Sequence, residues 1–135
     1  VYLEGDLGAG KTTMVRGLLR ALSDSSPVKS PTYTLVEIHV VSGLNFYHFD
    51  FYRFSNPEEY LDAGLEEYFD GNGICLVEWP AQAAPYLPEP DLVIRLAVDK
   101  NRRVADVQAT SPGGERCLTN FVPSAAMSSG SPPPP

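Results

Sequence analysis

The fold of this chain is decided by the stretch Gly5-Asp6-Leu7-Gly8-Ala9-Gly10-Lys11-Thr12. It matches the phosphate-binding loop G-x-x-x-x-G-K-[ST] at every fixed position. Residues 1–4 before it have the character of a strand end, and residues 13–22 after it place apolar side chains at helical spacing. This is the strand–loop–helix setting that the motif needs, so the sequence predicts a nucleotide-binding protein.

The residue types in the loop suit a phosphate chain. Gly5, Gly8 and Gly10 let the backbone approach phosphate oxygens closely and adopt positive φ angles. Successive N–H groups then form an anion nest at the N-terminus of a helix. Lys11 supplies a positive charge for the β- and γ-phosphates, and the Thr12 hydroxyl is a ligand for Mg²⁺.

An acid that follows a buried strand is the expected second anchor for Mg²⁺. Residues 74–77 are continuously apolar, which is typical of a strand covered on both faces, and Glu78 follows them directly. The alternative is a strand-end carboxylate on the surface. We favour the metal role for Glu78.

Asp50 is a candidate for orienting the water in hydrolysis. Alternation along the second expected strand puts Phe46, His48, Asp50 and Tyr52 on one face, so Asp50 lies among aromatic side chains near a strand end. A raised pKa is compatible with that setting, and His48 is placed to support Asp50. Pairing of Asp50 with Arg53 or with a turn N–H is an equally good interpretation.

Two further candidates rest on weaker patterns. Thr32, in the loop 30–32 after the first helix, occupies the place of a switch region, from which a Thr reaches the γ-phosphate or Mg²⁺. Ser-Pro-Thr is also ordinary loop composition. Arg103 could contact phosphate from a hairpin, although such an arginine is more often only solvated.

The remaining elements are predicted from periodicity and turn residues. A hairpin is expected from strands 33–40 and 44–52, followed by short helical segments that begin after Asn56-Pro57 and end before Gly71. Further strands are expected at 92–98, 104–109 and 117–121, with a hairpin turn at Gly113-Gly114. Residues 119–135 read as a disordered tail rich in Ser and Pro.

Composition excludes several classes of protein. The chain has no run near the ~20 apolar residues of a membrane span, and its two cysteines form no metal or disulfide pattern. We therefore expect a reducing, cytoplasmic environment and no membrane. The net charge is −7, and residues 50–91 hold ten acids against one arginine. Such a surface repels nucleic acid, so we expect only indirect contact with RNA.

Four motifs together resemble one family, TsaE, the bacterial ATPase of tRNA threonylcarbamoyladenosine biosynthesis. The phosphate loop continues through Thr13, and the match extends to about Leu118. The other three motifs are Lys29-Ser30-Pro31-Thr32-Tyr33-Thr34-Leu35-Val36-Glu37, Tyr47-His48-Phe49-Asp50-Phe51-Tyr52-Arg53 and Leu76-Val77-Glu78-Trp79-Pro80.

The resemblance implies a fold and a set of site residues. The fold would be an α/β P-loop NTPase domain over residues 1–118, with a central mixed or parallel sheet flanked by helices. ATP would bind at Gly8, Ala9, Gly10, Lys11, Thr12 and Thr13, with Trp79 and Arg103 near the nucleotide. Mg²⁺ would lie between Thr12 and Glu78. Catalysis would depend on Lys11, Asp50 and the switch residue Thr32.

The resemblance also implies partners. A TsaE subunit works with TsaB and TsaD, and its ATP hydrolysis is thought to reset the complex that modifies adenosine 37 in tRNAs reading codons that begin with A. The family normally has a helix and a strand ahead of the position of Val1, so we expect the chain to be a fragment.

Two other functions fit the phosphate loop. A small-molecule P-loop kinase would need a lid with arginines that clamp both substrates, and residues 56–91 contain no arginine. A scaffold subunit that binds ATP with negligible turnover is hard to distinguish from the ATPase by sequence. We find no Asn-Lys-x-Asp motif, which argues against GTP.

Overall fold

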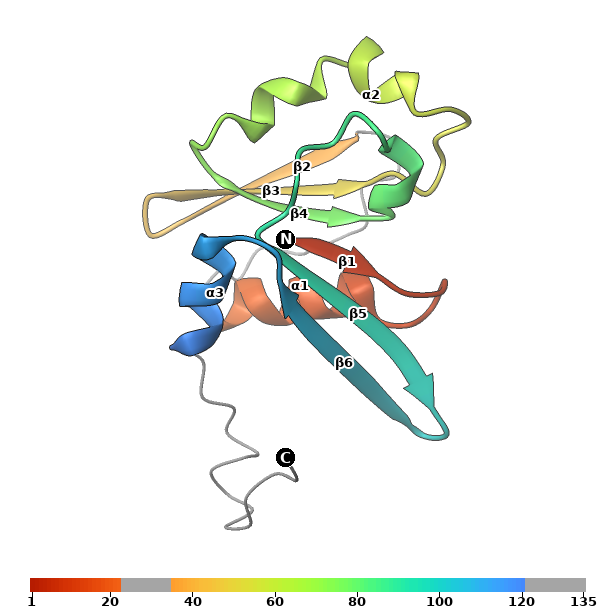
Figure 1. Ribbon diagram of the computed structural model, residues 1–135, viewed down its shortest axis with the longest axis vertical. Helices are drawn as coiled ribbons and strands as arrows, with labels where there is room; N and C mark the ends of the chain where they lie inside the picture. Colours follow the sequence, from red (N-terminus) through yellow and green to blue (C-terminus); the bar gives the residue numbers. More distant parts are fainter. Residues whose placement is uncertain (23–34, 121–135) are drawn as a thin grey trace.

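The computed structural model describes residues 1–22 and 35–120. Six strands form one sheet in the order β2-β3-β4-β1-β5-β6 (Figure 1). Their bounds are β1 Tyr2–Glu4, β2 Val36–Val41, β3 Leu44–Asp50, β4 Ile74–Glu78, β5 Leu92–Asp99 and β6 Arg102–Ala109. The four inner strands are parallel, and the edge strands β2 and β6 run antiparallel to their neighbours. The mixed α/β sheet that we expected is therefore confirmed.

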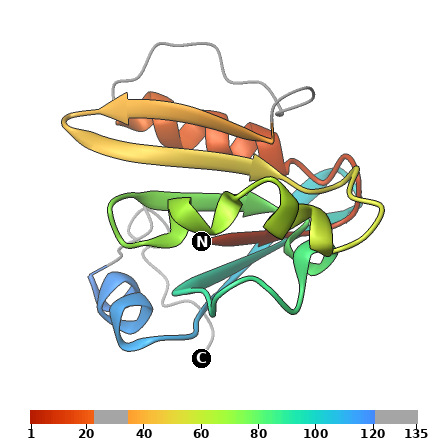
Figure 2. The ribbon, with the colours of Figure 1, turned by 90° about the horizontal axis from the view of Figure 1, so that it is seen from above.

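Helical segments cover both faces of this sheet. They are α1 (Lys11–Ala21), α2 (Glu58–Asp62), the 3₁₀ helices η1 (Leu65–Phe69) and η2 (Pro80–Ala83), and α3 (Pro112–Thr119). Seen from above, α1 and the α2–η1 segment lie on opposite sides of β3 (Figure 2). Within the described residues, no helix is long and apolar enough to cross a membrane.

Two apolar clusters hold these layers together. On one face, Val15 and Leu19 of α1 pack with Leu3, Phe46 and Leu76 of the sheet. Val15 and Leu19 are four residues apart and form the buried part of the apolar stripe that the sequence predicted, whereas Leu18 and Leu22 of the same stripe are 40% and 38% exposed. The packing of these side chains fixes α1, and with it the loop before the helix, against the centre of the sheet.

The second cluster lies on the other face and is largely aromatic. Phe49 and Phe51 are fully buried there, with Tyr60 of α2 and Leu65 of η1 packed against them. Phe49 also stacks on Phe69 with ring centroids 5.1 Å apart. Alternation along β3 thus sends Phe49 to this cluster and Phe46, His48 and Asp50 toward the face of α1.

The C-terminal segment differs from our expectation. We predicted a hairpin turn at Gly113-Gly114 and a strand over 117–121, whereas Pro112–Thr119 forms the helix α3. The Ser111 side chain caps this helix by accepting a hydrogen bond from the Gly114 N–H at 3.0 Å. Ser followed by Pro at the first helical position is a helix start, and this signal outweighs the two glycines.

Strand topology brings the expected site residues to one edge of the sheet. Parallel strands β1, β3 and β4 end at Glu4, Asp50 and Glu78, and Asp50 is the register partner of Glu78. The phosphate loop leaves the end of β1, between β4 and β5. In open parallel sheets, ligands bind at the carboxyl ends of the strands, which is where these residues meet.

Candidate active site

The loop between β1 and α1 directs its backbone toward an anion site. Gly8 and Gly10 have φ angles of +84° and +106°, which residues with side chains rarely adopt. Gly10 is the N-cap of α1; no side chain among the described residues caps the helix, and its first turn carries no acid. The N–H groups and the positive end of the helix dipole therefore favour a phosphate at this point.

Gly5 is required by packing as well as by loop conformation. A Cβ atom built at Gly5 would lie 2.5 Å from the carbonyl oxygen of Leu96 in β5. A Cβ at Gly8 would meet nothing within 4 Å. Gly5 thus lets the loop pass against β5, while Gly8 serves conformation alone.

The Lys11 side chain lies folded back over its own loop. It is 5% exposed, and its Nζ donates to the carbonyl oxygens of Gly5 at 2.6 Å and Asp6 at 2.9 Å. The same Nζ lies 4.3 Å from the centroid of the Trp79 ring. Phosphate oxygens are stronger acceptors than carbonyls or a ring face, so Lys11 is poised to exchange these contacts for a phosphate.

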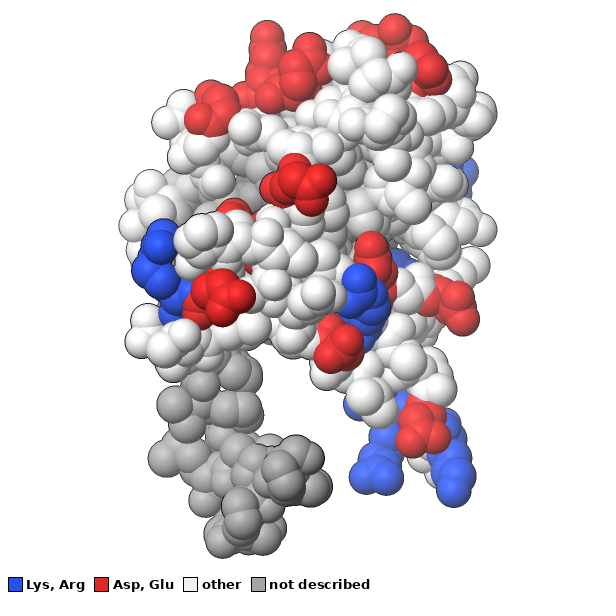
Figure 3. Space-filling model, viewed as in Figure 1, with Lys and Arg blue, Asp and Glu red and all other residues white. Residues whose placement is uncertain are grey.

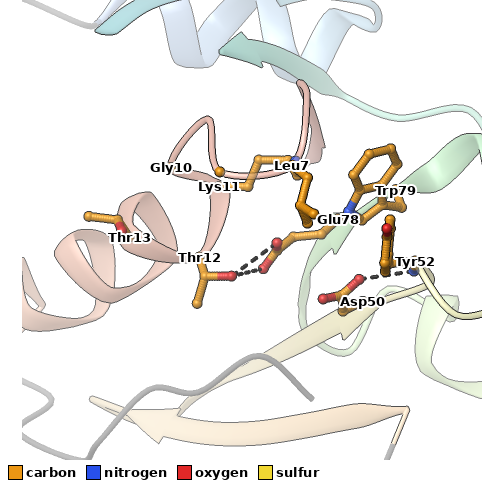
Figure 4. A pocket seen from close by; sticks show the side chains of 10 residues that line it. Leu7, Gly10, Lys11, Thr12, Thr13, Asp50, Tyr52, Glu78 and Trp79 are labelled. Carbon is orange, nitrogen blue, oxygen red and sulfur yellow. Dashed lines mark hydrogen bonds between the residues drawn. The ribbon is translucent and has the colours of Figure 1, made fainter. Parts of the chain in front are cut away.

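Thr12 and Glu78 meet beside this loop (Figure 4). The Thr12 Oγ1 lies 3.0 Å from Oε1 and 2.9 Å from Oε2 of Glu78. Glu78 ends β4 and is 3% exposed. The hydroxyl of the phosphate loop and the strand-end carboxylate therefore converge on one point, as the metal assignment requires.

His48 reaches Glu78 from the adjacent strand β3. Its Nε2 lies 2.6 Å from Glu78 Oε2, and the ring is fully buried. We expected His48 to support Asp50, two residues further along the strand. Its hydrogen bond goes to Glu78 instead.

Asp50 lies at the end of β3 and lines the same site. Burial raises the pKa of this carboxyl above the ordinary 3.8, the neighbouring Glu78 charge also raises it, and a hydrogen bond from the Tyr52 N–H opposes both. That N–H donates to Asp50 Oδ1 at 3.0 Å, so the turn contact that we considered for Asp50 is present. Oδ2 is the oxygen that remains available to a water.

Trp79 and Tyr52 form an aromatic pair at the mouth of the site. Their ring centroids lie 4.9 Å apart, and Tyr52 is 44% exposed. Trp79 has a φ of +58°, a strained conformation for a bulky residue. This backbone turn directly after Glu78 brings the indole over Lys11. Sequence reasoning missed Tyr52, although alternation had already placed it on the face of Asp50.

A cavity of about 220 Å³ lies between these groups. Small-molecule pockets usually measure ~300–1,000 Å³, so this cavity suits the phosphate end of a nucleotide. Its lining brings together most of the predicted site: Leu7, Gly8, Gly10, Lys11, Thr12, Thr13, Asp50, Tyr52, Glu78 and Trp79.

Two of the expected site residues, Ala9 and Arg103, are not part of this lining, and a third cannot be placed. The Ala9 side chain is 2% exposed, so only its backbone can face a ligand. Arg103 is exposed on β6; its Nε lies 4.0 Å from a Cβ built at Gly10, beside the loop and outside the cavity lining. Thr32 lies outside the described residues.

The donor set at Thr12 and Glu78 fits magnesium. Mg²⁺ takes hard oxygen ligands and is usually bound through one or two protein side chains together with substrate phosphates. A hydroxyl and a carboxylate that already lie within 3.0 Å of each other meet that description. The described residues contain no group of three or more His, Cys, Asp or Glu side chains that could hold a metal alone.

Comparison with known families gives one consistent match. The family model described as "Threonylcarbamoyl adenosine biosynthesis protein TsaE" matches residues 1–105. A solved relative, the crystal structure of Bacillus subtilis YdiB, superposes with a TM-score of 0.69 at 35% identity, over 87% of this chain and 72% of that one.

Curated proteins give the same result. The tRNA threonylcarbamoyladenosine biosynthesis protein TsaE of Haemophilus influenzae is 42% identical over 121 residues, which are 90% of this chain and 77% of the relative. The Bacillus subtilis protein of the same name is 44% identical over 104 residues, or 76% and 65% of the two chains. This chain therefore spans about two thirds to three quarters of the length of these relatives.

Proposed function

The chain belongs to the TsaE family of threonylcarbamoyl adenosine biosynthesis proteins, and from that premise we propose that it is the ATP-hydrolysing subunit of that system. Its role is in the threonylcarbamoyl modification of adenosine 37 in tRNA. The observation that carries the ATPase proposal is the Thr12–Glu78 contact beside Lys11. A phosphate loop alone holds a nucleotide, whereas turnover needs a second anchor for the metal and a group that positions water.

Each side chain has a defined task in this proposal. Lys11 exchanges its two carbonyl contacts for phosphate oxygens, and the N–H groups before α1 donate hydrogen bonds to the remaining phosphate oxygens. Thr12 and Glu78 hold Mg²⁺, which when bound neutralises charge on the β- and γ-phosphates. Asp50 keeps Oδ1 on the Tyr52 N–H and uses Oδ2 to orient a water toward the γ-phosphate.

Partners complete the proposal. We infer that the chain acts with TsaB and TsaD subunits and that hydrolysis resets their complex between turnovers. The acidic surface of this chain supports indirect contact with tRNA, because exposed carboxylates over α2 and η1 repel a phosphate backbone.

Glu78→Ala tests the metal role. ATP hydrolysis should be measured for the chain alone and with both partner subunits, alongside nucleotide affinity by calorimetry. We expect magnesium-dependent turnover to fall by about 100-fold or more, the order of magnitude for losing one electrostatic partner of a transition state. Nucleotide affinity should fall much less, because Lys11 and the loop remain.

Glu67→Ala is the matched control, since Glu67 is an exposed acid of η1. It should change neither quantity. An equal loss of turnover and affinity in Glu78→Ala would show that Glu78 does not serve hydrolysis. Wild-type chain that hydrolyses no ATP even in the full complex would favour the scaffold function instead.

A further inference from the structure

We propose that His48 is a positioning residue that holds the Glu78 carboxylate toward Thr12, ready for a divalent cation. This inference rests on the proposed metal role of Glu78. It assigns His48 a task through Glu78, with no contact of its own to nucleotide or metal.

The burial of the pair makes the contact consequential. His48 is 0% and Glu78 3% exposed, so the carboxylate depends on protein donors to replace water. Two side chains of the described residues donate to it. Thr12 Oγ1 shares one hydrogen between both carboxylate oxygens, and His48 Nε2 lies 2.6 Å from Oε2. If Thr12 turns to a metal, His48 is the donor that stays.

The hydrogen-bond network assigns the tautomer of His48. A carboxylate oxygen only accepts, so Nε2 carries the hydrogen. The buried Nδ1 has no partner among the described residues. We therefore assign Nδ1 as the nitrogen without a hydrogen. A buried N–H with no acceptor would cost more free energy than a buried lone pair with no donor. Within residues 1–22 and 35–120, the imidazole thus makes one hydrogen bond, to Glu78.

The register of the sheet explains why a residue of β3 can do this. Asp50 pairs with Glu78 and His48 pairs with Leu76 in the parallel β3–β4 ladder. His48 and Asp50 are two residues apart and project from the same face. Glu78 therefore has Asp50 beside it at the open edge and His48 one step back inside the sheet. His48 therefore contacts the Glu78 carboxylate from its buried side, and Thr12 contacts it from the other side.

A residue that hydrogen-bonds to a metal ligand affects how strongly the metal binds. Carboxylate ligands are usually fixed by a further hydrogen bond, and loss of that bond typically weakens metal affinity by about 10- to 100-fold. Without the Nε2 donor, the Glu78 side chain would gain rotamers in which its oxygens no longer face Thr12. The geometry therefore predicts that His48 controls how strongly magnesium supports nucleotide binding.

Two amide variants separate donation from packing. Gln can place its amide N–H near the position of Nε2, whereas the shorter Asn places it near Nδ1. His48→Gln therefore keeps the bond to Glu78 and His48→Asn removes it. The other histidine, His39 of β2, interacts with Glu37 at 3.5 Å, so His39→Asn is the matched control.

The readout is the affinity for a non-hydrolysable ATP analogue, measured by calorimetry with Mg²⁺ and with EDTA. The ratio of the two affinities is the magnesium coupling. We expect His48→Asn to lower this coupling by about 10-fold or more while the affinity in EDTA stays unchanged. His48→Gln and His39→Asn should keep the wild-type coupling. Urea unfolding of each variant establishes that it is folded.

Each result decides the proposal. Coupling that survives in His48→Asn overturns it, and so does an equal loss in the Gln and Asn variants, which would indicate packing alone. If His48→Asn does not fold, His48→Leu replaces it as the variant without a donor. A wild-type chain with no coupling at all overturns the proposed metal role, and this inference with it.

Discussion

The position of Asp50 disfavours the charged form of its carboxyl group, whereas the proposed role of Asp50 needs that form. Burial at the end of β3 raises its pKa, because the charged form loses water. The same position gives its Oδ2 access to the cavity, where an ionised oxygen is the better acceptor for a water. The fold therefore holds a charge that it disfavours, as is common where stability is exchanged for function.

Asp50→Asn should accordingly stabilise the chain in the absence of nucleotide and metal. With a raised pKa, the stability that Asp50 contributes is full below the ordinary 3.8 and is lost as pH rises through the raised value. Asn does not titrate and still accepts from the Tyr52 N–H. The variant should thus exceed wild type in urea unfolding at pH 7, and the gain should shrink toward pH 4. Turnover should fall at the same time.

Asp62→Asn, on the exposed end of α2, is the control for this experiment and should show no such pH-dependent gain. A difference between Asp50→Asn and wild type that is independent of pH, or a variant less stable at pH 7, would contradict the raised pKa.

Individual residues differ in how well the sequence predicts them. Lys11 and Thr12 follow from the loop motif, and Glu78 follows from its place after an apolar run, so their meeting could be expected from residue type alone. His48 could not be assigned in the same way. Its bond to Glu78 depends on the β3–β4 register, and that bond joins residues 30 apart in sequence.

At the scale of elements, α3 shows how turn chemistry can mislead. The glycines at 113 and 114 suggested a hairpin, but they occupy the first turn of a helix that packs beside β5 and β6. Gly114 is buried, and a Cβ built on it would lie 1.9 Å from the carbonyl oxygen of Asp91. Glycine is needed at position 114 because the backbone that leads into β5 leaves no room for a Cβ atom. No local sequence pattern reveals such a contact.

Gly114→Ala should therefore destabilise the chain. The added methyl collides with backbone, and overpacking of this kind costs about 1–3 kcal/mol. Gly113→Ala is the matched control: its Cβ would meet only ordinary contacts at 3.5 Å or more, and Ala favours a helix over Gly by about 0.5–1 kcal/mol. Urea unfolding should thus move the two midpoints in opposite directions. Two equal shifts would contradict the packing of α3 against Asp91.

At the scale of the whole molecule, one acidic and one basic group of side chains lie at opposite ends. Exposed acids gather over α2 and η1, and basic side chains lie at the tip of the β5–β6 hairpin (Figure 3). The acidic group comprises Glu58, Asp62, Glu66 and Glu67, and the basic group Lys100, Arg102 and Arg103. The hairpin tip therefore carries three exposed basic side chains, and its strand β6 brings Arg103 beside the phosphate loop.

Most of the strands could be predicted from alternation and turns, but their order in the sheet could not. β1 lies between β4 and β5, partners that are more than 70 residues distant along the chain. Local patterns carry no information about such pairings.

The site joins the phosphate loop, the start of α1 and the ends of β3 and β4, and we propose that it holds a triphosphate on Lys11. Calorimetric titration of ATP with Mg²⁺ into the wild type, Lys11→Ala and Arg20→Ala chains tests this most directly. Arg20 is exposed in the last turn of the same helix, so its loss removes an equal charge far from the loop. We predict saturable binding for the wild type and Arg20→Ala, and a loss of about 100-fold or more for Lys11→Ala, since removing one member of a buried charged pair costs ~2–5 kcal/mol. Unchanged affinity in Lys11→Ala would contradict the account.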